Sequence, residues 1–204
     1  MGAPPGPAGP RGSGRCACQG TRARQDPNDR PYTPAQIDRA LAVNLRAPAM
    51  LARLLAPAMV EAGRGHLAFV GSISGKTATK HSALYNATKF GLRGLALALR
   101  QDLHEHGVGV SVVQPGFVRD AGMCAATGAR PPAGLRTVSP RQVVTGLVRA
   151  VEHNRAEVNV APPEMRLLSA IGGQFPGFSE RVQRRSAGAD RTVHRIVEAQ
   201  RNHR

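Results

Sequence analysis

The sequence predicts an α/β protein built around a parallel β-sheet, and two observations lead to this fold class. Three short segments, residues 66–72, 108–116 and 156–162, are continuously apolar rather than alternating, which is typical of buried strands. Segments with apolar residues at helical spacing lie before and between them, and this alternation is that of a parallel sheet with crossover helices. Because the strands are continuously apolar, we expect the sheet to be covered on both faces.

The first residues and the first helix differ sharply in composition. Residues 1–31 consist mainly of Gly, Pro and Arg with few apolar side chains, so we expect a disordered leader. Order is expected from Thr33, because T-P-A-Q places a hydroxyl at the N-cap, Pro at the first helical position and Gln36 at the third, which is a capping box. Apolar residues then recur at helical spacing as far as Gly63, which predicts a helix over residues 34–62.

The rest of the chain continues the same pattern. A second long helix is predicted over residues 83–106, ended by Gly107. After the second strand, residues 117–138 form a connection rich in Gly and Pro. A capping box at Ser139 then starts a third helix, which leads to the last strand. Residues 163–204 are a basic C-terminal tail, and short amphipathic pieces predict that it is partly helical.

The charge of the chain does not point to nucleic acid as a partner. Its net charge is +15, which by itself suggests an anionic partner. However, the basic residues are scattered and nearly all are Arg, and aromatic residues make up only 3% of the chain with no Trp, so platforms for base stacking are lacking. No apolar run reaches the roughly 18 residues that span a bilayer, so we expect no transmembrane segment.

The cysteines and the N-terminus favour a reducing compartment. The chain has three cysteines, and the C-x-C spacing of Cys16 and Cys18 is not a usual zinc or redox spacing, so we expect neither disulfides nor a metal site. Residues 1–30 lack the apolar region of a signal peptide. We therefore expect a cytoplasmic protein.

Tyr85 and Lys89 form the first candidate for chemistry. They lie four residues apart in the second predicted helix, so their side chains share one face. A free phenol has a pKa of about 10, and a neighbouring ammonium lowers it by favouring the phenolate. A tyrosine tuned in this way can exchange a proton with an alcohol or carbonyl oxygen. Taken alone, the same spacing is also common on ordinary helix surfaces.

The strand ends add further candidates. Ser72 stands thirteen residues before Tyr85, at the carboxyl end of the first predicted strand, and ligands of open α/β sheets bind at that edge. Its hydroxyl is suited to bind the substrate oxygen, and Ser74 is the alternative for this role. Pro115 and Gly116 end the next strand at the same edge, where a bend exposes backbone groups, although Pro-Gly after a strand is also a simple turn signal.

Asn44 is a candidate because of Pro48. Proline has no N–H, so the carbonyl of Asn44 loses its ordinary helical partner, and we expect a kink at this point. A freed carbonyl that points inward is suited to hold a water molecule that relays protons to Lys89. The alternative is a solvated or back-bonded amide in an ordinary helix.

Together these residues resemble the short-chain dehydrogenase/reductase family. The resemblance covers residues 32–162, which would form a catalytic half-domain. The resemblance rests on Asn44, on Ser72, on the run Tyr85-Asn86-Ala87-Thr88-Lys89 and on the turn Pro115-Gly116-Phe117-Val118. It implies a Rossmann-type sheet, of which this chain would hold the C-terminal half. It also implies NAD or NADP as cofactor and a small-molecule alcohol or carbonyl compound as substrate.

The resemblance also implies a role for each site residue. Tyr85 would be the general acid/base, Ser72 would orient the substrate oxygen, and Lys89 would hold the nicotinamide ribose and lower the tyrosine pKa. Asn44 would anchor the water relay. The nicotinamide would be lined by Pro115, Gly116 and Val118, together with the tyrosine and the lysine, and residues 117–138 would form the substrate lid.

The sequence departs from the family pattern in two places. Where the family usually has Thr after the P-G-x-V turn, this chain has Asp120. The glycine-rich T-G-x-x-x-G-x-G turn that family members carry near their start has no match in residues 1–32. A truncated or frame-shifted reading of a longer gene would explain this boundary, and the edge of the first strand is then expected to lie open.

Two functions remain open at this stage. The first is an oxidoreductase that transfers a hydride between a nicotinamide cofactor and an alcohol or carbonyl compound. The second is a non-catalytic module that pairs with a full-length partner, because the resemblance implies that helices 34–62 and 83–106 build a dimer interface. The sequence leaves open the choice between NAD and NADP, the substrate and the direction of the reaction.

Overall fold

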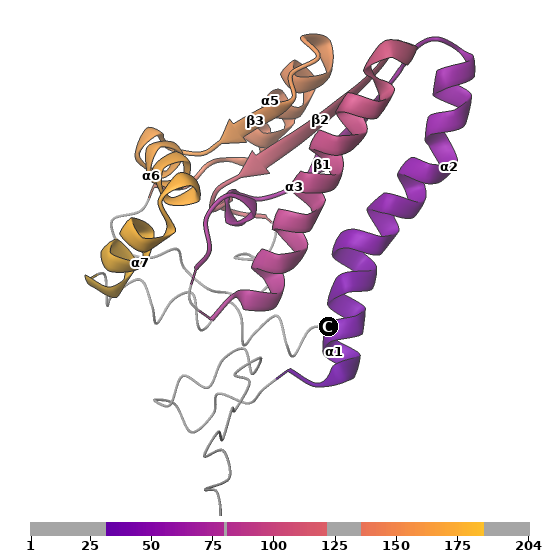
Figure 1. The fold of residues 1–204 in the computed structure, drawn as a ribbon. Coiled ribbons are helices and arrows are strands. Elements are labelled where there is room, and N and C mark those ends of the chain that lie inside the picture. Colours follow the sequence, from indigo (N-terminus) through magenta and orange to yellow (C-terminus); the bar gives the residue numbers. More distant parts are fainter. Residues whose placement is uncertain (1–31, 80, 122–135, 186–204) are drawn as a thin grey trace, which may run out of the picture. The chain divides into compact units, whose positions relative to one another are not determined.

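The computed structural model describes residues 32–79, 81–121 and 136–185, and it shows the α/β fold that the sequence predicts (Figure 1). The expected disorder of residues 1–31 and the centre of the 117–138 connection lie outside the described residues, as does the end of the C-terminal tail. Within the described ranges, no helix is long and apolar enough to cross a membrane.

The sheet has three parallel strands in the order β1-β2-β3. These strands are β1 (Gly65–Val70), β2 (Val108–Pro115) and β3 (Glu157–Val160). In this register Val70 lies opposite Val113, and Gln114 lies opposite Asn159. Parallel strands bring their carboxyl ends to one edge, so the segments that follow the three strands meet there.

The first predicted helix is present but is not continuous. Its capping box is confirmed, because the backbone N–H of Gln36 donates to Thr33 Oγ1 and the backbone N–H of Thr33 donates to Gln36 Oε1. The expectation of one helix over residues 34–62 is corrected, since a π-helical segment divides it. The pieces are α1 (Pro34–Leu41), η1 (Ala42–Arg46) and α2 (Ala47–Glu61).

The remaining helices begin and end close to the expected positions. Helix α3 ends at Leu103 and a 3₁₀ turn replaces its last residues, after which Gly107 reverses the chain with a φ of 72°. Ser139 caps α5 with the predicted capping box. The helices are α3 (Ala83–Leu103), η3 (His104–His106), α5 (Pro140–Glu152), α6 (Pro163–Gln174) and α7 (Pro176–Arg185), and a 3₁₀ turn, η2 (Ile73–Gly75), follows β1.

The main core lies between the sheet and the helices α2 and α3, which run side by side in Figure 1. Its buried side chains are Leu67, Phe69, Val108, Val110 and Val112 from the strands and Ala52, Leu92, Ala96 and Leu103 from the helices. Helix α5 packs on the other face of β2 and β3, where Ser111 Oγ donates to the carbonyl of Ala150. Each fully buried aliphatic side chain of this kind stabilises the fold by about 1.5–3 kcal/mol.

The expectation that both faces of the sheet are covered holds for β2 but is wrong for β1. All eight residues of β2 are buried, whereas β1 alternates between buried and exposed positions. Leu67 and Phe69 face the core, but Ala68 is exposed and Val70 is 51% exposed, because α5 packs mainly on β2 and β3. Among the described residues, no strand pairs with the outer edge of β1.

Candidate active site

Tyr85 and Lys89 lie on one face of α3, in its first two turns. Lys89 Nζ is 5.7 Å from the centroid of the Tyr85 ring, and it donates a hydrogen bond of 3.3 Å to the carbonyl of Val70. Both side chains are half-buried. Because Val70 is the last residue of β1, the phenol and the ammonium lie close to the carboxyl edge of the sheet.

Ser72 lies at the same edge but in a turn, since β1 ends two residues before it. This corrects the strand predicted over residues 66–72. Ser72 is the N-cap of η2, and its Oγ accepts a hydrogen bond of 3.1 Å from the backbone N–H of Ser74. A hydroxyl can accept one hydrogen bond and still donate its own proton, so Ser72 keeps the ability to bind a substrate oxygen. The alternative residue Ser74 has its carbonyl engaged by Asn86.

Asn86 joins the turn after Ser72 to helix α3, and its role was not predicted from the sequence. Its Nδ2 donates to the carbonyls of Ser74 (3.1 Å) and Thr77 (3.0 Å), and its Oδ1 accepts from Thr79 Oγ1 (3.3 Å). The side chain is 5% exposed, so these three bonds replace water almost completely. Asn86 therefore fixes the turn that carries Ser72 against the helix that carries Tyr85.

Gly75 allows this turn to pass close to α3. A Cβ atom at Gly75 would lie 2.7 Å from the carbonyl oxygen of Lys89 and 3.1 Å from Gln114 Oε1. The first distance is shorter than real Cβ contacts, and its partner is backbone that cannot move aside. Glycine at this position thus lets the turn fit between α3 and β2.

The distortion expected at Asn44 is present as the π-helical segment η1. The backbone N–H of Ala47 donates to the carbonyl of Ala42, five residues earlier, and Asn44 Nδ2 donates to the carbonyl of Ala40 at 3.0 Å. Pro48 has no N–H to offer to the carbonyl of Asn44, which explains why the helix widens here. The segment lies beside α3, since a Cβ at Gly91 would be 3.2 Å from Leu45 Cδ2.

Pro115 and Gly116 end β2 at the same edge of the sheet. The backbone N–H of Gly116 donates to the carbonyl of Val160, which joins this turn to the end of β3. A Cβ at Gly116 would lie 3.4 Å from the Cε and Sδ atoms of Met165, so α6 packs directly against the turn. The turn therefore contacts both the sheet and the C-terminal helices.

Val118 lies at the base of the connection 117–138. It forms a parallel bridge with Val138, and the backbone N–H of Arg119 donates to the carbonyl of Val138 at 2.9 Å. Asp120 follows with a φ of 61°, and its exposed carboxylate is 3.7 Å from Arg119 Nε. The two ends of the predicted lid thus meet, while its central part lies outside the described residues.

Glu157 at the start of β3 forms ion pairs with two basic side chains, and the sequence did not predict this cluster. Lys76 Nζ forms an ion pair with Glu157 Oε1, and Arg93 Nε donates to Oε2 at 2.6 Å. Burial opposes the ionisation of Glu157, but hydrogen bonds and charge from Lys76 and Arg93 outweigh it and hold the pKa of this carboxyl below its usual value. The cluster ties the turn after β1 to α3 and β3.

This pKa shift predicts an acid-dependent loss of stability. The folded pKa lies below the unfolded value of about 4.3, so ionised Glu157 stabilises the fold above that pH, and the stabilisation is lost as the pH falls through the folded pKa. We expect the free energy of unfolding to fall more steeply below about pH 4.3 in the unmodified chain than in Glu157→Gln. Urea unfolding at several pH values measures both slopes. The exposed Glu152→Gln serves as control, and equal slopes for Glu157→Gln and the unmodified chain would contradict this account.

The buried amide of Gln114 and the buried amide oxygen of Asn159 lie on neighbouring strands close to the turn. Gln114 is fully buried, and neither its Nε2 nor its Oε1 has a hydrogen-bond partner among the described residues; the same holds for Oδ1 of its neighbour Asn159. A buried amide without a partner is costly and usually marks a functional or strained position. A glutamine within the apolar strand VGVSVVQP was a visible signal in the sequence.

The described residues include no group of three or more His, Cys, Asp or Glu side chains that could hold a metal ion. The chemical groups at the carboxyl edge are instead a phenol, an ammonium and a hydroxyl. These groups can exchange protons and bind oxygen atoms of a ligand.

Comparison with known proteins assigns this chain to one family. The family model for short chain dehydrogenases matches residues 19–131, which is more than half of the chain. The chain therefore belongs to the short-chain dehydrogenase family. The sequence of the ketoacyl reductase HetN of Nostoc sp. is 34% identical over 160 residues, which cover 75% of this chain and 55% of that protein.

Solved structures agree with the fold. A short-chain dehydrogenase of Sphingobium yanoikuyae in complex with NADPH has a TM-score of 0.60 at 21% identity, covering 73% of this chain and 58% of that one. A protein of Beutenbergia cavernae described as an NAD(P)-dependent gluconate 5-dehydrogenase, solved with bound NADP, has a TM-score of 0.55 at 28% identity, covering 64% and 57%. The chain thus spans little more than half the length of these relatives.

Proposed function

We propose that this chain is an NAD(P)-dependent oxidoreductase that acts on an alcohol or carbonyl compound. The observation that carries the proposal is the pair of Tyr85 and Lys89, which lies near the carboxyl edge of the sheet with 5.7 Å between the ammonium and the phenol ring. Membership of a family whose solved relatives bind NADPH or NADP supports a nicotinamide dinucleotide as cofactor.

The residues at this edge fit the nicotinamide end of such a cofactor. Lys89 donates to the carbonyl of Val70 at the end of β1, and its ammonium would hold the hydroxyl groups of the nicotinamide ribose. Pro115, Gly116 and Val118 would line the nicotinamide; Pro115 is buried at the end of β2, whereas Gly116 and Val118 are half-buried. The glycine-rich turn that binds phosphates in the family has no counterpart in the sequence of residues 1–32, so the affinity is expected to come from these groups.

In the proposed reaction the residues of this chain move the proton and hold the oxygen. Tyr85 Oη gives its proton to the substrate oxygen in carbonyl reduction, or takes it in alcohol oxidation, and Ser72 Oγ donates a hydrogen bond to the same oxygen. The Lys89 ammonium favours the phenolate and so eases the transfer. A bound nicotinamide dinucleotide supplies or accepts the hydride.

Asn44 is proposed to complete the proton route. Pro48 has no N–H to donate to the carbonyl of Asn44, which is then suited to hold a water molecule that reaches Lys89. Replacing Pro48 with Ala restores an N–H at this position, so we expect the segment to return to an α-helix and turnover to slow by about tenfold or more. A crystal structure and kcat of the variant measure both effects. Pro57→Ala in the same helix is the control, and an unchanged π-helix with an unchanged rate would rule out the relay.

The reaction itself is tested with a panel of aldehydes and ketones in the presence of NADH or NADPH. The proposal predicts that reduced nicotinamide is consumed only when a carbonyl compound is present, in proportion to the protein concentration. The name of the Nostoc relative makes ketoacyl compounds the first members of the panel. If no member is reduced although the cofactor binds, the proposal is wrong.

A second candidate function is supported by the surface of α2. Leu51, Leu54 and Leu55 are exposed on this helix, with Leu54 at 63%, and such a stripe favours pairing with another chain. In this case the chain would act as a non-catalytic module or would form a homo-oligomer through α1–α2 and α3. Sedimentation of the purified chain distinguishes a monomer from an oligomer, and the panel above distinguishes an active from an inactive assembly. For either function we propose the cytoplasm as the location.

A further inference from the structure

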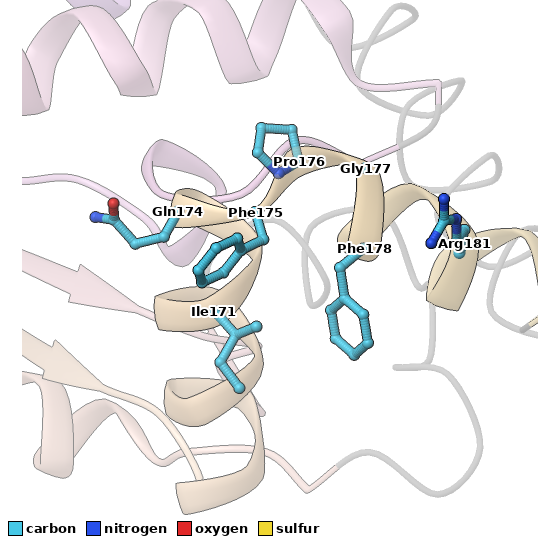
Figure 2. A pocket seen from close by; sticks show the side chains of 7 residues that line it. All are labelled: Ile171, Gln174, Phe175, Pro176, Gly177, Phe178 and Arg181. Carbon is cyan, nitrogen blue, oxygen red and sulfur yellow. The ribbon is translucent and has the colours of Figure 1, made fainter.

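Helices α6 and α7 border an open hollow on the surface that the Tyr85–Lys89 pair does not use. Its volume is about 580 Å³, which lies within the range of about 300–1,000 Å³ typical of small-molecule sites. Figure 2 shows Ile171 and Phe175 projecting from α6, and Phe178 from α7, toward the same side. Gln174, Pro176, Gly177 and Arg181 complete the lining.

The side chains that line the hollow are mostly apolar, and one of them, Arg181, is positively charged. Phe175 is 64% exposed and Phe178 is 49% exposed, so two aromatic rings face solvent in the hollow, and apolar surface of this kind can mark a ligand-binding groove. Within the described part of the chain, no carboxylate pairs with Arg181. The chain as a whole carries a charge of +15, so its field adds to the attraction of an anion.

The hollow is connected to the candidate active site through α6. At its start, Met165 contacts the turn at Gly116, and near its end a Cβ at Gly173 would lie 2.8 Å from the carbonyl oxygen of Lys76. Thr77 Oγ1 and Ser179 Oγ are 3.2 Å apart, which joins α7 to the turn after Ser72. The two helices are therefore packed against two of the segments that form the carboxyl edge.

We propose that this hollow binds a single-chain anionic amphiphile, such as the anion of a fatty acid. The apolar chain lies against Ile171, Phe175 and Phe178, and the anionic head pairs with the Arg181 guanidinium, which is suited to bind a carboxylate with two parallel hydrogen bonds. Combined with the proposed function, on which this step rests, the assignment makes the substrate class a carbonyl compound with an apolar chain and an anionic group.

The test is a calorimetric titration of the purified 204-residue chain with sodium dodecanoate, below its micelle concentration and without cofactor. We expect saturable binding that Phe178→Ser weakens by about tenfold or more, because it removes an aromatic ring that the bound apolar chain would cover. Arg181→Gln should reduce the preference for dodecanoate over dodecyltrimethylammonium, which has the same chain and a cationic head, by about fivefold or more. Phe90→Ser and Arg141→Gln, at exposed positions on α3 and α5, serve as controls and should leave the binding unchanged.

The contradicting results are equally specific. The proposal is overturned if dodecanoate does not bind, if the cationic amphiphile binds equally well, or if the control variants lose as much affinity as the hollow variants. Binding to vesicles of anionic lipid without binding of monomeric dodecanoate would assign the surface to a membrane and would also overturn it. Because Tyr85→Phe should leave dodecanoate affinity unchanged, failure of the proposed reaction and failure of this site give different results.

Discussion

Replacing Tyr85 with Phe is expected to lower kcat for carbonyl reduction by about 10²–10⁴-fold, the usual contribution of a positioned general acid. The substitution removes only the phenolic oxygen, so the ring keeps its place near Lys89 and the packing of α3 is preserved. Affinity for the nicotinamide cofactor should change little, because the ammonium remains. Steady-state rates with a carbonyl substrate and reduced nicotinamide, together with a separate cofactor titration, measure the two quantities.

The chain supplies its own control for this experiment. Tyr32 is the only other tyrosine, and it lies just before the first helix, so Tyr32→Phe should leave kcat near that of the unmodified chain. Equal rates for the unmodified chain and Tyr85→Phe would mean that another group donates the proton. Equal losses in both variants would point to a general effect on folding, which the free energy of unfolding would reveal.

Replacing Asn86 with Ala is expected to lower the free energy of unfolding by about 2–4 kcal/mol, since it removes three hydrogen bonds and leaves two carbonyls without their donor. This is a large part of the 5–15 kcal/mol or so by which ordinary domains are stable. The loss should be concentrated in the turn after β1, so amide hydrogen exchange of residues 72–79 should become faster than that of β2. Denaturant unfolding and hydrogen exchange measure these effects.

Thr79→Val is the matched variant for this prediction. It removes only the bond of 3.3 Å to Asn86 Oδ1, so its cost should stay near 0.5–1.5 kcal/mol, about the net value of one ordinary hydrogen bond. A cost for Asn86→Ala as small as that of Thr79→Val would show that the Ser74 and Thr77 carbonyls find other donors. In that case Asn86 would not fix the position of the Ser72 turn.

Local signals in the sequence were sufficient for most of the fold. The capping boxes at Thr33 and Ser139 depend on residues three positions apart, and the end of the second helix depends on one glycine, Gly107. The three strands were recognised from apolar runs of a few residues. The widened helix at Asn44 was also foreseen as a kink, because a proline four residues on removes a specific N–H.

The features that the sequence did not predict depend on contacts between segments far apart in the chain. Glu157 lies close to Lys76 and Arg93 only because the sheet and α3 pack together. No spacing of these residues along the chain predicts the cluster. The apolar run of β1 predicts a strand as far as Ser72, whereas the strand ends at Val70 and Ser72 caps the turn that follows. The exposure of Val70 depends on where α5 lies, which periodicity within the strand cannot indicate.

A titration of the purified chain with NADH and with NADPH tests the central claim most directly. Nicotinamide fluorescence reports the binding, and the chain contains no Trp that would interfere. We predict saturable binding that Lys89→Ala weakens strongly and that Arg141→Gln, at an exposed position on α5, leaves unchanged. If neither cofactor shows saturation at millimolar concentration, or if Lys89→Ala binds as well as the unmodified chain, the carboxyl edge formed by Ser72, Tyr85 and Lys89 is not a nicotinamide site and the proposed oxidoreductase function is contradicted.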